Sequence, residues 1–166
     1  MMRASRVLLA MGVSVASASA AQTIDPPAGL TLAFEFSARG DQIYECVSGE
    51  GGYQWRLKGP RADLFDASGA KVGRHYVGPT WEADDGSRIQ GKLVASQKAP
   101  DGVSVAWLLL SVAEHQGQGR MSDVAYVRRI DTKGGAAPKT PCAAEQAGQT
   151  SGSPYEAKYQ FYRGVK

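Results

Sequence analysis

Apolar and polar residues alternate along several stretches of the chain. In residues 155–161, YEAKYQF, aromatic residues and alanine occupy the odd positions, and charged or amide side chains occupy the even ones. Residues 53–58 and 88–95 show a similar period of two. Because successive side chains of an extended strand point to opposite faces, this pattern predicts strands with one face buried and one face in solvent.

Two further stretches are less regular or apolar on both faces. Residues 104–113, SVAWLLLSVA, are rich in branched and aromatic side chains, which favours a central strand, although the pattern also fits a short buried helix. We expect residues 122–130 to be the partner strand, because the eight residues between Ala113 and Ser122 suit a hairpin loop. The remaining candidate strands are 30–36, 41–47, 61–66 and 71–77.

Turn signals separate these stretches. Glycine follows small or acidic residues in 67–69, 84–87 and 100–102, where its tolerance of positive φ favours a tight turn. Strands spaced about 10 to 12 residues apart with such turns are typical of sandwiches and barrels. No helix longer than two turns is evident. We therefore predict an all-β fold, a single antiparallel β-barrel or β-sandwich domain of about eight to ten strands.

Residues 133–153 interrupt the regular spacing. Fifteen of these twenty-one residues are Gly, Ala, Pro, Ser or Thr, and a loop of that length usually has a function or is tied to the fold. The loop contains Cys142, and the only other cysteine is Cys46. We expect one Cys46–Cys142 disulfide, with two free thiols as the alternative. In the chain-entropy model, a disulfide that closes so long a loop increases the free energy of unfolding by as much as ~4.7 kcal/mol.

The first twenty residues have the three parts of a secretory signal. Arg3 and Arg6 provide a positive start, residues 7–15 form a short, mostly apolar run, and small side chains precede a cleavage point after Ala20 or Ala21. A membrane anchor is the alternative, but spanning a bilayer takes about 20 apolar residues and this run is roughly half as long. We therefore predict a signal peptide over 1–20, a lead-in and first strand over 21–40, and an all-β domain over 41–166 in a periplasmic or secreted protein.

Charge and length narrow the function classes. The chain has 19 basic and 16 acidic residues, a net charge of +3, and losing Arg3 and Arg6 with the signal leaves +1. Arg128 and Arg129 are expected to point to opposite faces of a strand. A near-neutral domain without a Lys/Arg run argues against nucleic-acid binding. Nothing after the signal is long and apolar enough for an integral membrane segment, and the remaining residues suit one domain.

The order of several segments resembles a known family. DQIYEC, VAWLLL, YVRRIDTKGGAAPKTPC, PYEAKYQFY and the long stretch YQWRLKGPRADLFDASGAKVGRHYVGPTWEADDGS are similar to the secreted family catalogued as domain of unknown function 3455. The resemblance runs from about Asp41 to Tyr162. It implies a bacterial or fungal exported domain and brings no catalytic residue to this chain.

Residues 73–87, GRHYVGPTWEADDGS, concentrate the candidate chemistry. If 71–77 is a strand, His75 and Tyr76 point to opposite faces. We expect His75 to meet a carboxylate across the Gly78–Pro79 bend, from Glu82, Asp84 or Asp85. Such a pair could serve acid–base chemistry or metal ligation.

Metal binding has weaker support from the spacing. A zinc site could combine His75, His115 and one carboxylate, but no motif such as H-E-x-x-H relates these residues. Residues 84–87 lack the alternating ligands and distant glutamate of a calcium loop, so a polar hairpin turn is the better interpretation. The metal therefore stays unassigned.

Trp81 is the aromatic residue most suited to a binding surface. It follows Gly78, Pro79 and Thr80, where we expect the backbone to leave regular strand pairing. We therefore place Trp81 in a loop with the acidic residues, at the mouth of a pocket. Aromatic rings with a polar edge are common on binding faces, although at strand spacing they more often belong to a core.

No reaction motif accompanies these residues. The chain lacks a G-x-S-x-G elbow, a phosphate loop and a dinucleotide fingerprint, so we predict no cofactor and favour a non-catalytic role. The leading hypothesis is a module that binds a small molecule, a glycan or an envelope component. Its binding face would use His75, Tyr76, Trp81, Glu82 and Asp84, with Asp85 beside them. The alternatives are a metal-assisted or acid/base hydrolase using His75 with Glu82 or Asp85, and a structural envelope or matrix protein.

Overall fold

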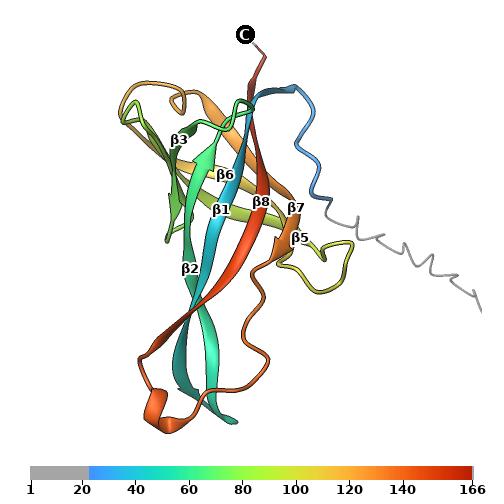
Figure 1. The fold of residues 1–166 in the computed structure, drawn as a ribbon. Helices are drawn as coiled ribbons and strands as arrows, with labels where there is room; N and C mark the ends of the chain where they lie inside the picture. The colour runs from blue at the N-terminus through green and yellow to red at the C-terminus, as the bar shows by residue number, and fades with distance from the viewer. Residues whose placement is uncertain (1–22, 166) are drawn as a thin grey trace, which may run out of the picture.

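The computed structural model describes residues 23–165 as one closed barrel of eight antiparallel strands (Figure 1). Each strand pairs with the next in sequence, and β8 closes the sheet by pairing with β1. The strands are β1 (Leu30–Gly49), β2 (Gly52–Phe65), β3 (Lys71–Tyr76), β4 (Thr80–Ala83), β5 (Arg88–Gln97), β6 (Trp107–Gln116), β7 (Val124–Gly134) and β8 (Thr150–Gly164). The predicted all-β antiparallel fold is confirmed. The sequence left a barrel and a sandwich open, and the structure is a barrel.

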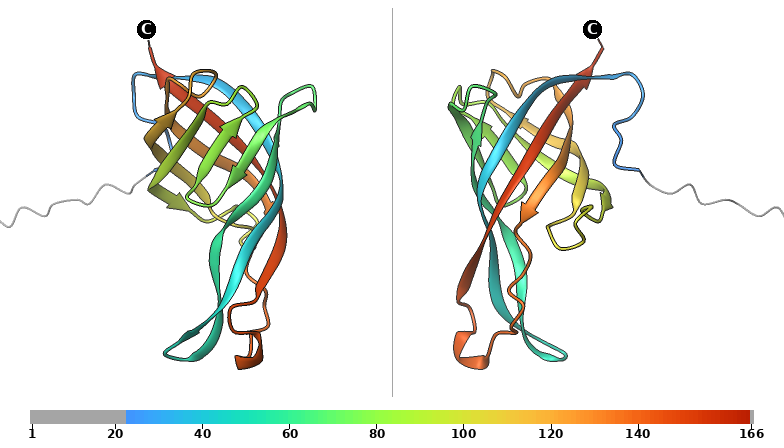
Figure 2. Two further views of the ribbon diagram at one scale, coloured as in Figure 1. Left: turned by 90° about the vertical axis from the view of Figure 1, so that its left-hand side faces the viewer. Right: turned by 45° about the vertical axis from the view of Figure 1, so that its right-hand side comes forward.

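The three long strands β1, β2 and β8 extend beyond the barrel as a twisted ribbon (Figure 2). β1 runs without a break for twenty residues, so the predicted separate strands 30–36 and 41–47 are one strand. Burial alternates along it at Phe36, Ala38, Gln42, Tyr44 and Cys46. Shifts in register accommodate its length against both neighbours, at residues 32–34 and at 43–44.

Residues 104–113 contribute a strand and not a helix. β6 begins at Trp107 and reaches Gln116, and residues 117–123 connect it to β7. Leu110 faces the barrel interior, whereas Leu109 faces outward into a second, smaller apolar cluster. Ile24 of the lead-in packs into this outer cluster, and Asp25 pairs with Arg128 at 3.1 Å. The lead-in is therefore anchored along the outer face of the barrel.

One end of the barrel is filled by apolar side chains. The rings of Phe34, Phe36 and Phe161 pack together with centroids 4.8 to 5.3 Å apart, and Leu64 and Val124 are fully buried beside them. We call this the closed end. It lies where the turns at 66–70 and 84–87 and the connection 117–123 meet the barrel.

Asp85 and Ser87 hold the two loops of the closed end together. Asp85 Oδ1 accepts hydrogen bonds from the backbone N and Oγ of Ser87, and its Oδ2 accepts one from the backbone N of Arg120 at 2.8 Å. The fully buried Ser87 hydroxyl also accepts a hydrogen bond from the backbone N of Met121, at 3.1 Å. Gly119 is required here, because a Cβ at this position would lie 2.5 Å from the Asp85 carboxylate.

The ribbon at the other end carries the disulfide. Cys46 of β1 is bonded to Cys142, and the two cysteines are 96 residues apart in sequence. The backbone of Cys46 also pairs with Gly148 and Gln149, and Tyr44 Oη donates to the Gly135 carbonyl at 2.7 Å. The predicted loop 133–153 is thus shorter, because β7 continues to Gly134 and β8 begins at Thr150. It contains one short 3₁₀ turn, η1 (Ala144–Gln146).

The signal peptide predicted over 1–20 lies outside the described residues. Within residues 23–165, no helix has the length and apolar character needed to span a membrane.

Removing the disulfide should destabilise the ribbon and lower the free energy of unfolding. Replacing Cys46 and Cys142 together by serine releases a long loop in the unfolded chain, so we expect a loss of about 2 to 4 kcal/mol in urea unfolding. Hydrogen exchange should rise first in 44–56 and 135–150, because these segments depend on the bond for their contacts. Unchanged unfolding and exchange would mean that the disulfide contributes nothing to the fold.

Asp85→Ala should loosen the closed end. The variant removes three hydrogen bonds from an ionised carboxylate. Because this carboxylate is solvent-exposed, we expect a loss of about 1 to 2 kcal/mol at neutral pH. The Ser87 side chain and the Arg120 backbone hold the pKa of Asp85 below its ordinary value. The loss should therefore be complete above about pH 4 and should shrink as the pH falls further.

Asp84→Ala is the matched control for Asp85→Ala, since it removes the same charge from the same turn. Thermal unfolding of both variants between pH 3 and pH 7 measures the difference. Equal losses for the two aspartates would contradict a specific role for Asp85.

Candidate functional site

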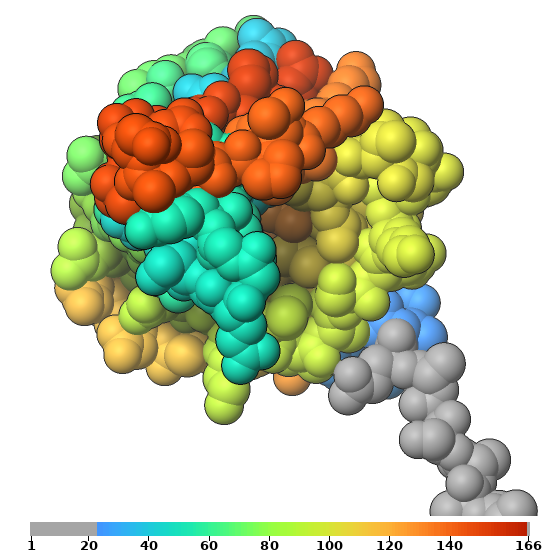
Figure 3. Space-filling view, turned by 90° about the horizontal axis from the view of Figure 1, so that it is seen from below, coloured from blue at the N-terminus to red at the C-terminus, as the bar shows by residue number. Residues whose placement is uncertain are grey.

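The barrel interior is hollow at the end opposite the packed phenylalanines. A cavity of about 310 Å³ lies there, between β2, the turn at residues 77–79 and strands β5 and β6. Seen from this end, the hollow lies between the teal β2 segment, the orange segment after β7 and the yellow segment after β5 (Figure 3). We call it the open-end cavity. Its apolar wall is formed by Leu57, Pro60, Pro79, Leu93, Leu108 and Leu110.

Two rings from neighbouring strands form the inner wall of the open-end cavity. His75 of β3 and Trp81 of β4 are cross-strand partners, and their rings stack with centroids 4.5 Å apart and planes 9° apart. The Tyr159 ring meets the His75 ring edge-on at 4.9 Å. Gly91 of β5 makes room for this stack, because a Cβ there would lie 2.9 Å from the Trp81 ring.

The His75 ring is neutral. Its Nδ1 donates a hydrogen bond to the Thr80 carbonyl at 2.8 Å, which leaves Nε2 as an unprotonated acceptor. Burial lowers the pKa of His75 to about 3, and the positive charge of Arg129 acts in the same direction. His75 is therefore uncharged throughout the ordinary pH range.

Arg129 of β7 lines the open-end cavity as a positive charge. Its Nε and Nη2 both donate to the Ala106 carbonyl, at 3.0 and 2.7 Å, so the guanidinium is held in place. Within residues 23–165, no carboxylate lies within ion-pair distance of Arg129. Arg128, one residue earlier, points to the outer face and pairs with Asp25, so the two arginines take opposite faces as predicted.

Two buried N–H groups on cavity-lining side chains have no hydrogen-bond partner among the described residues. They are Nε2 of Gln42 and Nε1 of Trp81, and each side chain is only 1% exposed. An unpaired buried donor costs about 1 to 3 kcal/mol, so such groups usually meet a water or a ligand. Both groups belong to side chains of the open-end cavity wall.

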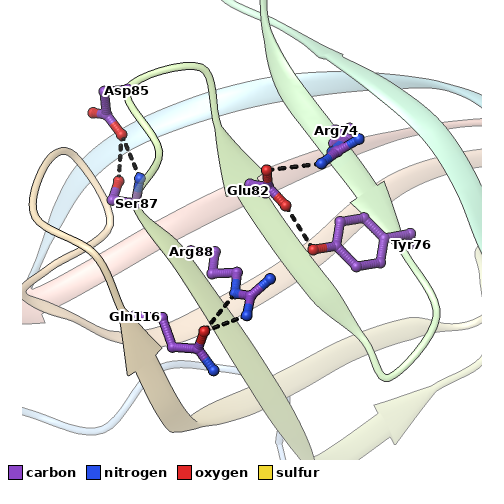
Figure 4. Close-up of polar contacts among 7 residues, drawn as sticks. All are labelled: Arg74, Tyr76, Glu82, Asp85, Ser87, Arg88 and Gln116. Carbon is purple, nitrogen blue, oxygen red and sulfur yellow. Dashed lines mark hydrogen bonds and ion pairs between the residues drawn. The ribbon is translucent and has the colours of Figure 1, made fainter.

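Tyr76 and Glu82 lie on the other face of the sheet. Glu82 accepts hydrogen bonds from Tyr76 Oη at 2.6 Å and from Arg74 Nη2 at 2.9 Å (Figure 4). These two bonds lower the pKa of Glu82, the bond from Tyr76 being the stronger influence. The three residues line an outer groove of about 660 Å³, with Arg88, which bonds to Gln116, at its edge. The polar groups of Arg74, Tyr76 and Glu82 thus satisfy one another.

The six predicted binding residues do not share one face, although His75, Tyr76 and Glu82 all line the outer groove. His75 and Trp81 point into the barrel, Tyr76 and Glu82 point outward, and Asp84 and Asp85 lie in the turn at the closed end. Trp81 is also not in a loop, since strand pairing resumes at Thr80 directly after a three-residue turn. His75 therefore contacts none of the three predicted carboxylates, because its ring is on the opposite face of the sheet from Glu82.

The predicted zinc ligands are likewise apart. The imidazole Nε2 of His115 bonds to the Val124 carbonyl at 2.7 Å, and His115 lies on β6, three strands around the barrel from His75 on β3. Across the described part of the chain, no group of three or more His, Cys, Asp or Glu side chains is arranged to hold a metal ion.

Sequence reasoning missed Gln42, Arg129 and Tyr159 as site residues. A usable signal was present for two of them: Gln42 shares the inward face of β1 with Ala38 and Tyr44, and Arg129 shares that of β7 with Val127. A polar side chain at an inward position of an otherwise apolar strand face indicates an interior site. Tyr159 gave no such signal, because an aromatic residue at an inward position is ordinary core.

The comparisons with known proteins give the family and no function. The model of the family described as protein of unknown function (DUF3455) matches residues 26–163, so the chain belongs to this family. The match extends the predicted resemblance toward the N-terminus. No curated protein and no solved structure matches the chain.

The buried imidazole should make the stability of the protein fall in mild acid. Between about pH 6.5 and pH 3 the unfolded chain binds a proton at His75 that the folded chain does not, so stability decreases as the pH falls through this window. The effect is at most about 1.4 kcal/mol per pH unit. His75→Gln should remove this pH dependence, even if the substitution also changes the free energy of unfolding by an amount that is the same at every pH.

Urea unfolding at several pH values between 4 and 7 measures the slope of each variant. His115→Gln, which removes the other histidine at an exposed position, is the matched control. If His75→Gln and the unsubstituted protein show parallel stability profiles, the neutral buried state of His75 is wrong.

Proposed function

We propose that this DUF3455 domain is a binding module that holds a small molecule in the open-end cavity of its barrel. The observation that carries the proposal is the pair of unpartnered N–H groups on Gln42 and Trp81, two side chains that line a largely apolar cavity. A barrel of eight strands has an interior just wide enough to be filled by side chains or to hold one small ligand. In this barrel, side chains fill the closed end, and we propose that the open end holds the ligand.

The cavity has the character of a ligand site. Small-molecule sites are concave and mostly apolar, with a few placed polar groups, and their volumes begin at about 300 Å³. The open-end cavity is about 310 Å³, and His75, Arg129 and Tyr159 supply polar groups beside the two unpartnered donors. Stacking and backbone hydrogen bonds hold His75 and Arg129 in place before any ligand arrives.

The outer groove is the weaker candidate for a ligand. It is larger and more open, but Tyr76, Arg74 and Glu82 already bond to one another. A ligand there would have to replace existing hydrogen bonds, whereas a ligand in the cavity would supply missing ones.

Binding without catalysis agrees best with the surroundings of His75. Its Nδ1 bonds to a backbone carbonyl, and Glu82, Asp84 and Asp85 are all outside the cavity. The ring is therefore placed as a fixed acceptor and stacking surface. A histidine base oriented by a carboxylate, as the hydrolase hypothesis required, has no counterpart here.

Export of the module belongs to the same proposal. A disulfide between distant parts of the chain persists in an oxidising compartment, which agrees with the signal predicted over 1–20. The ligand is accordingly a molecule of the periplasm or the exterior.

Ligand binding should appear first at the indole N–H of Trp81. The experiment screens mixtures of small compounds, each of up to about ten non-hydrogen atoms, by proton–nitrogen NMR. We expect some of these compounds to shift the Trp81 Nε1–H signal. The protein has three tryptophans, so the variant Trp81→Phe assigns the signal. Trp55, whose indole N–H donates to the carbonyl of Thr140, is the internal control.

Two results would oppose the proposal. Compounds that bind but shift only signals of the outer groove around Tyr76 would place the site there. A Trp81 signal that no compound moves, in a folded protein, would leave the cavity without a ligand-binding role.

A further inference from the structure

We propose that the open-end cavity selects a carboxylate on a short apolar body, with the carboxylate group next to Arg129. This inference rests on the proposed function and goes beyond it, because it names the chemical class of the ligand. Four features of the cavity support it: the charges, the unpaired donors, the apolar rim and the volume.

The charges that line the cavity have one sign. Lys58 and Arg129 are the basic residues of its wall, and no aspartate or glutamate of the described chain lines it. Lys58 lies 3.7 Å from Glu45, so its charge is partly balanced at the rim. His75 adds no charge, because its Nδ1 bonds to a carbonyl and its ring is buried. Arg129 is thus the unbalanced charge, and it favours an anion and opposes a cation.

Arg129 is fixed in a position to bind an anion. Its Nε and Nη2 are bonded to the Ala106 carbonyl, which orients the guanidinium without neutralising it. A guanidinium has five N–H donors, so donors remain for a second partner. A partly buried cation without a counter-ion is unfavourable, and a bound carboxylate removes that penalty with charge-assisted hydrogen bonds.

The neutral donors of the cavity also call for an acceptor. Gln42 Nε2 and Trp81 Nε1 have no partner, and both belong to side chains of the cavity wall. A carboxylate offers two oxygens with about four lone-pair sites and no donor of its own. It therefore suits a group of donors better than an alcohol or an amine does.

The outer part of the cavity suits an apolar body. Leu57 and Leu93 line it and are 52% and 56% exposed, which places two large apolar side chains in solvent at the same opening. Leu108 and Leu110 continue this surface inward. An apolar chain lying across them would remove this area from water, at about 25 cal/mol per Å².

The volume limits the size of the ligand. Water occupies about 30 Å³ per molecule in the liquid, so a cavity of about 310 Å³ corresponds to roughly ten waters. A ligand of about ten non-hydrogen atoms fills it. Octanoate has this size, and its amide, alcohol and amine keep the same apolar chain.

The experiment measures binding of octanoate, octanamide, octanol and octylamine to the whole mature protein by calorimetry, with the Trp81 N–H signal confirming the location. We expect octanoate to bind at least about tenfold more tightly than the amide or the alcohol, since a hydrogen bond to a charged group contributes about 1.5 to 3 kcal/mol. Octylamine should bind most weakly of the four.

A pair of variants isolates the role of Arg129. Arg129→Gln should remove the preference for octanoate over octanamide. Arg128→Gln is the matched control, because it removes the same charge from the same strand on the outer face, and it should keep the preference. The comparison of the four compounds on the unsubstituted protein stands even if Arg129→Gln fails to fold.

The outcomes separate this inference from the proposed function. If the four compounds bind equally and shift the Trp81 signal, the cavity is a ligand site but does not select carboxylates. If octylamine binds best, the charge argument is wrong. If none of the four binds while other compounds move the Trp81 signal, the carboxylate class is overturned and the binding function stands. If nothing moves that signal, both fail.

Discussion

The stacked pair of His75 and Trp81 is the contact on which the interior arrangement depends. The two rings come from adjacent strands, meet edge-on with Tyr159 from across the barrel, and are almost completely buried. Trp81 belongs both to the main core cluster and to the wall of the open-end cavity, so it lies at the boundary between the packed half and the hollow half. Side chains pack on one side of the stack, and a ligand can be held on the other.

The two ends of the molecule support this division by different means. At the closed end Asp85 and Ser87 join two loops, and the phenylalanine cluster fills the interior beneath them. At the open end the ribbon of β1, β2 and β8 continues past the barrel and is tied by the disulfide. The disulfide therefore holds β1, which carries Gln42, and the joined loops hold the ends of β5 and β6, which carry part of the apolar wall; this agrees with a preformed site of fixed shape.

Much of the fold could be predicted from local pattern alone. A period of two identifies the strands, places His75 and Tyr76 on opposite faces and separates Arg128 from Arg129. Two cysteines in a chain predicted to be exported indicate their pairing. The position of Trp81 could not be predicted in this way. Gly78 has a φ of +93°, which allows a turn of three residues, and pairing then resumes at once. The predicted loop is therefore a strand. Of the carboxylates expected near His75, Glu82 is on the other face of the sheet, and Asp84 and Asp85 are in the turn at the closed end. Closure of the barrel, which brings β1 and β7 residues into one cavity, depends on pairings between distant strands that local pattern does not contain.

A crystal structure of the mature protein grown with octanoate tests the account most directly. We expect an open cavity beside the stacked rings, with carboxylate oxygens within hydrogen-bond distance of Arg129 and an acceptor on the indole N–H of Trp81. A cavity filled by neighbouring side chains, with the Trp81 N–H bonded to the protein itself, would contradict it.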